Sequence, residues 1–439
     1  MRVDKFYVFK ISYQPILIRY SQIFGIELVF GFNHFKKAFM RSNRRKRFSI
    51  WVRFLFGACV VFCAHRVESQ ETELVRLDSE EIKALQTEYE SLKQACGKAL
   101  EKIAQTHVRY IDSTLEEGSD ARKEWEQLKL ECQLKFDELE GVAKQLFDAQ
   151  EKPPVELAEL VFRIQGKTLR DGFAGEAFRI GQKLIAAYPD KKEFQRITAL
   201  AAIKVNEFEF AKKFYSEDRE AIEKFEEEYS MLFGSIDELV TKFEREKQFR
   251  ERDAENELPL VTIKTNRGVI KIELFEDQAP GTVANFISLT EQGFYNGKDF
   301  HWVLKGFGAQ IGRFGHQRPV DINYCILDEF DREDARHHFR GSVTLAKSEV
   351  ANSGNESFFI CLEPVPFQDG KRTVFGRVVE GLDLIDSITH TFQRVEDGEP
   401  EWIPETRPDY IEEATVTRKR AGSEYKINKV PRVGAGASQ

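Results

Sequence analysis

One stretch decides the fold: TNRGVIKIELFEDQAPGTVANFISLTEQGFYNGKDFHWV, from Thr265 to Val303. It opens with the polar turn sequence NRG and then alternates apolar and polar residues from Ile270 to Leu274. This pattern predicts a β-hairpin with the alternating LVTIK that precedes it. Pro280 follows at a position that the first turn of a helix tolerates, ahead of apolar residues at helical spacing. The stretch therefore predicts a hairpin followed by a helix.

The chain continues in the same manner from about Leu258 onward. Short segments of alternating residues are separated by glycine turns, a pattern typical of a β-barrel. A second helix is predicted over LDLIDSI, from Leu382 to Ile388. Two helices could close the two open ends of such a barrel.

A series of motifs is completed by three later stretches, GSVTLAK, NESFFICL and FQDGKRTVFGRVVEGLDLIDSI. In order and spacing the series resembles the signature blocks of the cyclophilin family of peptidyl-prolyl cis/trans isomerases. The resemblance covers about Leu258 to Arg420. It implies a closed eight-stranded antiparallel β-barrel capped by two helices, with the active groove on the outer face of the barrel.

A site for this reaction needs few chemical groups, but it needs them in a defined geometry. Rotation about a prolyl bond meets a barrier of about 20 kcal/mol, because the nitrogen lone pair is delocalised into the carbonyl group. No proton need move and no covalent bond need form, so we expect no metal and no cofactor. The site needs an apolar pocket for the proline ring, groups that hold the flanking backbone, and a donor directed at the amide nitrogen.

The resemblance implies two catalytic positions, Trp302 and Gln310, of which Gln310 holds the substrate backbone. The substrate-binding positions that it implies are Phe307, Leu345, Ala346, Lys347, Phe359, Phe367 and Arg372. Phe307 and Phe359 would form the proline pocket, with Leu345 at its edge. Taken alone, each phenylalanine indicates ordinary core packing, and the motif context is what favours a groove.

The sequence also departs from the family motif. Trp302 stands in place of an arginine and Lys347 in place of an asparagine, while Phe367 and Arg372 replace a tryptophan and a histidine. Tryptophan offers one neutral N–H donor, whereas arginine offers a charged fork of five. Two functions therefore remain open: a prolyl isomerase with reduced activity that assists protein folding, and a non-catalytic module that binds proline-containing peptides or acts as a scaffold.

The N-terminal residues predict export rather than a folded domain. From Met40 a basic segment is followed by an apolar run from Phe54 to Ala64 and by Val67-Glu68-Ser69, whose small final residue suits cleavage before Gln70, so residues 40–69 are predicted to be a secretory signal peptide. The run is short for a membrane span, which leaves an uncleaved anchor as the alternative. Residues 1–39 are expected to precede the true start. The mature chain is expected in the periplasm or cell envelope, with no stable membrane insertion.

Residues 70–244 are predicted to be helical. Asp78 and Glu81 form a capping-box pattern, and the apolar residues that follow recur at steps of three and four. A helical hairpin with residues 121–147 is favoured over a coiled coil between chains. Ala143, Ala177 and Ala211 are 34 residues apart, which faintly resembles tetratricopeptide repeats; an irregular bundle is the alternative. A repeat array would offer a surface for a protein partner.

Two further segments are polar. Residues 245–257 are charged and are predicted to be a linker, and residues 421–439 are predicted to be a disordered tail. The pair His337-His338 is expected in a solvated loop rather than at a metal, because no third ligand stands nearby.

Composition limits the remaining possibilities. The chain has 439 residues and a net charge of -8, which gives no indication of nucleic-acid binding. Cys96, Cys132, Cys325 and Cys361 follow the predicted signal and are too widely spaced for a disulfide framework, so we expect four buried thiols. The expected partners are proline-containing peptides and unfolded client proteins.

Overall fold

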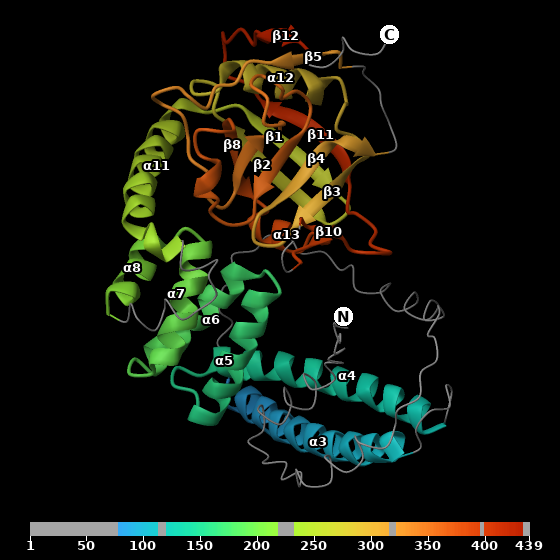
Figure 1. Ribbon diagram of the computed structural model, residues 1–439. Coiled ribbons are helices and arrows are strands. Elements are labelled where there is room, and N and C mark those ends of the chain that lie inside the picture. Colours follow the sequence, from blue (N-terminus) through green and yellow to red (C-terminus); the bar gives the residue numbers. More distant parts are fainter. Residues whose placement is uncertain (1–77, 113–119, 218–231, 316–321, 396–398, 433–439) are drawn as a thin grey trace, which may run out of the picture. The chain divides into compact units, whose positions relative to one another are not determined.

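The computed structural model describes residues 78–112, 120–217, 232–315, 322–395 and 399–432 (Figure 1). The predicted leader and signal peptide lie outside these ranges. The chain divides into two compact units, with the boundary between Val161 and Phe162. Among the helices of the described ranges, none combines the length and the apolar character that crossing a membrane requires.

The first unit contains a helical hairpin. Its helices are α3 (Ser79–Asp112) and α4 (Asp120–Ala149), which pack against each other and bury Cys96 and Cys132. The capping box is confirmed at the start of α3: the Asp78 carboxylate accepts a hydrogen bond from the backbone N–H of Glu81 at 2.9 Å. In return the Glu81 carboxylate accepts one from the backbone N–H of Asp78 at 2.8 Å. The expected hairpin is therefore present.

Shorter helices follow. They are α5 (Val155–Arg170), α6 (Ala174–Ala187), α7 (Lys192–Lys204), α8 (Phe208–Glu217) and α11 (Ile236–Asn256). Ala177 in α6 and Ala211 in α8, which the 34-residue spacing singled out, are both fully buried, since each lies where neighbouring helices meet. A repeat architecture stays a prediction.

The charged segment 245–257 differs from the expected linker. Most of it forms the C-terminal half of α11, and Glu246, Phe249 and Asp253 are buried there. The physical reason is Arg336, which lies on the β domain. Its guanidinium is 3.1 Å from the Glu246 carboxylate and 2.8 Å from that of Asp253. Charge alone indicated a solvated segment, but these charges are paired.

The β domain is built on one curled sheet of ten strands. Their order across the sheet is β10-β9-β3-β4-β7-β6-β8-β2-β1-β11. The strands are β1 (Leu260–Thr265), β2 (Gly268–Leu274), β3 (Lys298–Leu304), β4 (Gly308–Gly315), β6 (Ser342–Leu345), β7 (Phe358–Cys361), β8 (Val374–Glu380), β9 (Phe392–Gln393), β10 (Glu401–Trp402) and β11 (Ile411–Arg418). All pairings between these strands are antiparallel except that of β3 with β9.

The expected closed eight-stranded barrel is therefore wrong in detail. The short strands β9 and β10 extend the sheet beyond β3, where an eight-stranded barrel would close against β11. Within the described residues, β3 and the segment at β11 meet through an isolated bridge between Asp299 and Tyr410 and two backbone hydrogen bonds, Phe300 to Asp409 and Gly297 to Ile411.

Two helices flank the sheet, as predicted. They are α12 (Pro280–Glu291), with Pro280 in its first turn, and α13 (Leu382–Asp386); they lie at opposite ends of the curled sheet (Figure 1). The inward residues of the strands, such as Ile263, Ile272 and Ile360, form one core with α12. Cys325 and Cys361 are buried, so all four thiols are buried and unpaired, as expected.

Phe339 joins the β domain to the helices of the same unit. It precedes β6, yet its ring packs 4.9 Å from Phe243 of α11 and 5.8 Å from Phe208 of α8. Phe339 is thus part of the helical core. A second link is a buried ion pair in which Lys204 lies 2.5 Å from Glu363. These helices and the β domain therefore form one packed unit.

The C-terminal segment also differs from its prediction. Instead of a disordered tail, residues 429–431 form β12 (Lys429–Pro431), which pairs with β5 (Tyr324–Ile326). Tyr425 and Ile427 pack against the core of the β domain. Polar composition concealed these apolar contacts, while residues 433–439 lie outside the described ranges.

Candidate active site

Strand register brings four side chains into one row. Trp302 of β3 is opposite Gln310 of β4, Gln310 is opposite Phe359 of β7, and Phe359 is opposite Thr344 of β6. Directly opposite residues in antiparallel strands share a face of the sheet. Their neighbours Val303, Ala309, Ile311 and Phe358 belong to the interior core. The row therefore lies on the outer face.

Phenylalanine side chains form an apolar wall on this face. The Phe307 ring stacks on Phe359 with centroids 5.6 Å apart and planes at 25°, and lies 5.9 Å from the Phe367 ring. Ala346 and Phe307 pack against a small cluster of Phe359, Cys361 and Val365 that is separate from the main core. Phe367 is 55% exposed, so the wall is open to solvent. The surface can receive a ring without unfolding.

Two polar groups face this wall. Trp302 and Gln310 are half-buried, and the Trp302 ring meets Phe307 edge-on at 5.4 Å. Within the described part of the chain, neither the Gln310 amide nor the Trp302 indole N–H has a hydrogen-bond partner. An amide that can both donate and accept is therefore free to hold the backbone of a bound peptide.

Lys347 and Arg372, which were predicted to bind substrate, are engaged elsewhere. The Lys347 side chain is 5% exposed and its ammonium lies 3.5 Å from the Asp328 carboxylate. Arg372 donates to Gln368 at 2.9 Å, to Glu349 at 3.1 Å and to the backbone carbonyl of Lys347. The structure thus uses both cations to hold the loops beside the wall.

Leu345 lies on the opposite face from Ala346. It is buried in the interior core of the β domain, because it follows Thr344 of the outer row in β6 and consecutive residues of a strand point to opposite faces. It therefore lies away from Phe307 and Phe359 rather than at the edge of their pocket. Of the nine positions implied by the resemblance, six gather on the outer face: Trp302, Phe307, Gln310, Ala346, Phe359 and Phe367.

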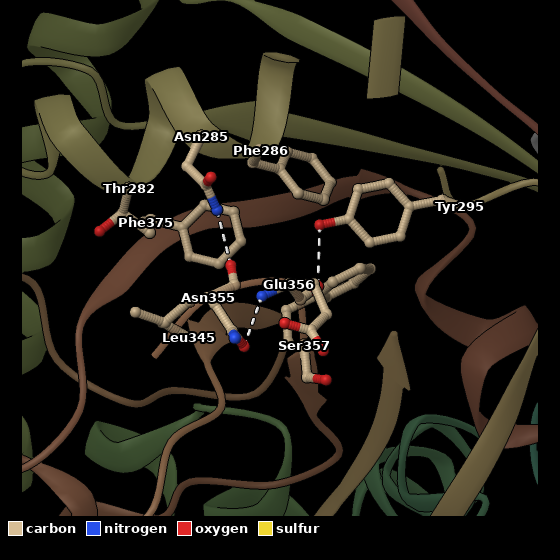
Figure 2. A pocket seen from close by; sticks show the side chains of 10 residues that line it. Thr282, Asn285, Phe286, Tyr295, Leu345, Asn355, Glu356, Ser357 and Phe375 are labelled. Atoms are coloured by element: carbon tan, nitrogen blue, oxygen red, sulfur yellow. Dashed lines mark hydrogen bonds between the residues drawn. The ribbon is translucent and has the colours of Figure 1, made fainter. Parts of the chain in front are cut away.

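Leu345 instead lines a small cavity inside the β domain, between α12 and the segment before β7. Figure 2 shows the Tyr295 hydroxyl directed at the backbone of Glu356, at 3.0 Å, and the Asn285 amide directed at that of Asn355, at 2.6 Å. The cavity has a volume of about 10 Å³, which is room for about one water molecule. A proline ring cannot enter it, so the outer face remains the candidate site.

A charged cluster that sequence reasoning missed supports the loop carrying Phe367. Asp369, two residues further on, accepts hydrogen bonds from His338 at 2.8 Å and from Lys242 of α11 at 2.9 Å, and lies 3.2 Å from the His337 ring. The His338 side chain is buried, contrary to the solvated loop expected for this pair, because it packs against that carboxylate. No sequence signal linked residues so far apart.

Two pKa values in the cluster are lowered. Burial acts to raise the pKa of Asp369, but hydrogen bonds from His337 and His338, and then Lys242, hold its pKa well below its usual range. Burial lowers the pKa of His338, an effect that Asp369 offsets in part. At neutral pH the Asp369 carboxylate is therefore ionised, and the buried imidazole is expected to be neutral.

We expect Asp369→Asn to lower the free energy of unfolding at pH 7 by about 2 kcal/mol, because the amide loses charge-assisted hydrogen bonds. A carboxyl group whose pKa is depressed by folding stabilises the fold above its unfolded value of about 3.9, and this contribution is lost as the pH falls below it. The difference between wild type and variant should therefore shrink below about pH 4. Urea unfolding at pH 7 and pH 3.5 checks this, and an unchanged difference would contradict it.

The aromatic wall also continues past Trp302. The Trp302 ring lies 5.8 Å from Phe392 of β9, and Phe392 lies 5.5 Å from Trp402 of β10 in an edge-on contact. Sequence reasoning missed both residues. The two aromatic residues in THTFQ and PEWIP were the available signal, but nothing in the sequence placed them beside Trp302.

Comparison with known proteins bears on the part of the chain that carries this site. The family model described as cyclophilin type peptidyl-prolyl cis-trans isomerase/CLD matches residues 260–416. A peptidyl-prolyl cis-trans isomerase of Helicobacter pylori (strain ATCC 700392 / 26695) is 38% identical over 137 residues, covering 29% of this chain and 78% of that protein. One of Synechococcus elongatus is 35% identical over 136 residues, covering 29% and 86%.

Two solved structures are similar to part of this chain, with low TM-scores. A cyclophilin from Hirschia baltica has a TM-score of 0.30 and 27% identity, covering 36% of this chain and 73% of its own. A cyclophilin type peptidyl-prolyl cis-trans isomerase from Cryptosporidium parvum, solved in the presence of the dipeptide ala-pro, has a TM-score of 0.30 and 27% identity, covering 36% and 99%.

Proposed function

The chain belongs to the cyclophilin-type peptidyl-prolyl cis-trans isomerases and is an enzyme of that class; we propose that it isomerises prolyl bonds at the outer aromatic wall, with reduced turnover. The observation that carries this proposal is the row Trp302, Gln310 and Phe359. It sets an unpaired amide directly between an indole and the ring on which Phe307 stacks.

The geometry of the wall fits the requirements of prolyl rotation. The stacked rings of Phe307 and Phe359 offer the proline ring an apolar surface, and the exposed Phe367 closes one side of it. Gln310 holds the backbone that flanks the proline through its amide. One half of the peptide is then fixed while the other rotates, and catalysis depends on a donor that binds the twisted amide more strongly than the planar one.

Trp302 is the residue that limits the rate of turnover. Its indole N–H is the neutral donor nearest to Gln310 in the row, where the family has a charged arginine. Loss of one preorganised donor to a transition state typically costs a factor of about 10² to 10³. The ring is also held between Phe307 and Phe392, so it serves packing as well as donation.

We expect Trp302→Arg to raise kcat for a short proline peptide about tenfold, because a charged donor is restored beside Gln310. Binding of the peptide should change less than turnover, since the donor acts mainly on the twisted amide. A protease-free isomerisation assay, read by exchange between cis and trans resonances, measures kcat. Trp302→Phe, which keeps an aromatic ring and removes the donor, is the matched control and should lower kcat.

A folded Trp302→Arg protein that binds peptide but is no faster than wild type would refute the limiting role of this position. The alternative function, a module that binds proline peptides without turnover, is favoured by one further observation. Lys347, another substituted polar position, is buried against Asp328 and supplies no donor to the wall. If the chain is such a non-catalytic module, wild type and both Trp302 variants would bind peptide, and none would accelerate cis-trans exchange.

We also propose that the enzyme acts outside the cytoplasm, in the periplasm or cell envelope. This rests on the basic segment and apolar run within residues 40–69 and on the cleavage pattern before Gln70. Cell fractionation and N-terminal sequencing test it, and an intact segment on cytosolic protein would refute it.

The short helices α5 to α8 are proposed to present a surface to a client or partner protein. A pull-down with and without substitutions on that surface would test this.

A further inference from the structure

We propose that Trp302, Phe392 and Trp402 form a second subsite, which binds an apolar or aromatic side chain of the client polypeptide a few residues from the proline. We call these three residues the aromatic extension. The inference rests on the proposed function, because it takes the wall at Phe307 and Phe359 as the proline site. It adds a reason why this chain would turn over some prolines in preference to others.

The aromatic extension is continuous with the proline wall. Each ring meets the next in an unbroken series, from Phe307 to Trp302 at 5.4 Å, on to Phe392 at 5.8 Å, and on to Trp402 at 5.5 Å. Aromatic rings at these separations attract one another and leave edges and faces available to a further ring. A chain lying on the wall therefore meets more aromatic surface where the wall would otherwise end.

The extension lies on the surface and is held in place. Trp402 is 43% exposed, Phe392 and Trp302 are half-buried, and none of the three belongs to the interior core. Phe392 and Trp402 are directly opposite in the pair β9–β10 and so share a face. Thr391 fixes this pair to β3: its backbone N–H donates to the Val303 carbonyl at 3.1 Å, and its hydroxyl accepts from the Val303 N–H at 2.8 Å.

This attachment bears on binding. A surface whose rings are already positioned spends little conformational entropy when a ligand docks. The backbone of Ile403, next to Trp402, also donates to the Thr391 carbonyl at 2.8 Å, which holds β10 to β9. The exposed tryptophan is therefore presented on a fixed pair of strands rather than on a free loop.

The occupant is a segment of the same client chain that carries the proline. From Phe307, three ring-to-ring steps reach Trp402, and an extended peptide advances about 3.3 Å per residue, so a residue within about five positions of the proline reaches the extension. Exposed Glu399 and Glu401 lie beside Trp402 in the sequence. They favour a lysine or arginine next to the bound aromatic residue and disfavour an acidic one.

The test uses the full mature chain and peptides of one length with a single central proline. The reference peptide has alanine at all variable positions, and in the others one phenylalanine occupies each position up to five residues on either side. For wild type, phenylalanine on one side of the proline is expected to raise kcat/KM about five- to tenfold over the reference. Trp402→Ala should remove that gain, so that the phenylalanine peptides and the reference peptide have the same kcat/KM in this variant.

Tyr410→Ala is the matched control, because Tyr410 is an aromatic residue with the same exposed fraction, 43%, and has no place in the extension. It should keep the gain. Affinity for the same peptides, labelled with fluorescein and followed by anisotropy, gives a readout that does not depend on turnover. No gain in kcat/KM or affinity at any position, or a gain that survives Trp402→Ala, would overturn the subsite. A reference peptide that is bound but never isomerised would instead overturn the proposed activity, while affinities still decide on the subsite.

Discussion

Arg336→Met is expected to lower the free energy of unfolding by about 3 kcal/mol, the largest stability effect that we anticipate. The Arg336 side chain is 0% exposed and lies between the rings of Phe249 and Phe275, 4.0 Å from the centroid of each. Its guanidinium pairs with the buried carboxylates of Glu246 and Asp253. Removing one partner from a buried ion pair leaves charge uncompensated and typically costs about 3–5 kcal/mol.

The lower end of that range applies because Arg377 lies 3.3 Å from the Asp253 carboxylate and remains in the variant. Burial already raises the pKa of Asp253, against the lowering effect of Arg336, and the substitution should raise it further. A carboxyl group whose pKa is raised by folding destabilises the fold as the pH rises through that value. The loss of unfolding free energy in Arg336→Met should therefore be larger at pH 8 than at pH 5.

Urea unfolding followed by circular dichroism measures this, with Arg332→Met as the control. Arg332 pairs with Asp334 at 3.0 Å, but both side chains are about 40% exposed, so its loss should cost less than about 1 kcal/mol. Equal effects of the two substitutions would contradict the role of Arg336 in holding α11 to the β domain.

Phe307→Ala is expected to reduce kcat/KM for a short proline peptide about 30- to 100-fold. Phe307 is the ring that meets Phe359, Phe367 and Trp302 at once, so its removal opens the wall at its centre. Losing a phenylalanine side chain from an apolar contact costs about 2–3 kcal/mol, which corresponds to that factor. Because the ring contacts substrate before and during rotation, most of the loss should appear in KM.

Phe173→Ala is the matched control, since Phe173 is a partly exposed phenylalanine of the helical part, remote in sequence from the wall. It should leave kcat/KM unchanged. Thermal unfolding of both variants separates a local effect from loss of fold. A folded Phe307→Ala protein with wild-type kcat/KM would show that the proline is bound elsewhere.

Part of the fold could be predicted because its signals are local. The alternation around Ile272 and the Pro280 helix start each depend on a few neighbouring residues, and both elements are present. The same holds for the capping box at Asp78 and Glu81. The hairpin of α3 and α4 followed from one apolar seam and a short connection.

Features that depend on distant partners could not be predicted. The charged end of α11 resembled a linker until Arg336, more than 80 residues away, was found between Glu246 and Asp253. Nothing in the sequence around Phe339 indicated that its side chain belongs to the helical core. Strands β9 and β10 have two residues each, too few to show an alternating pattern.

Within the site, motif positions gave the correct neighbourhood but not the direction of every side chain. Leu345 is the last residue of β6 and lies in the interior core, whereas Ala346 follows the strand and packs against the cluster at the wall, yet the resemblance implied a groove role for both. The resemblance implied substrate-binding roles for Lys347 and Arg372, whereas Asp328 and Glu349 pair with them. The wall of Phe307 and Phe359 was predictable because the resemblance implied both residues as the proline pocket.

The measurement that tests the central claim most directly is a protease-free isomerisation assay on the full chain, with a proline peptide followed by exchange between its cis and trans resonances. The account predicts catalysed exchange that is measurably faster than in buffer at micromolar protein, that depends on Phe307 and that increases in Trp302→Arg. An exchange rate indistinguishable from buffer for the folded wild-type protein would contradict it.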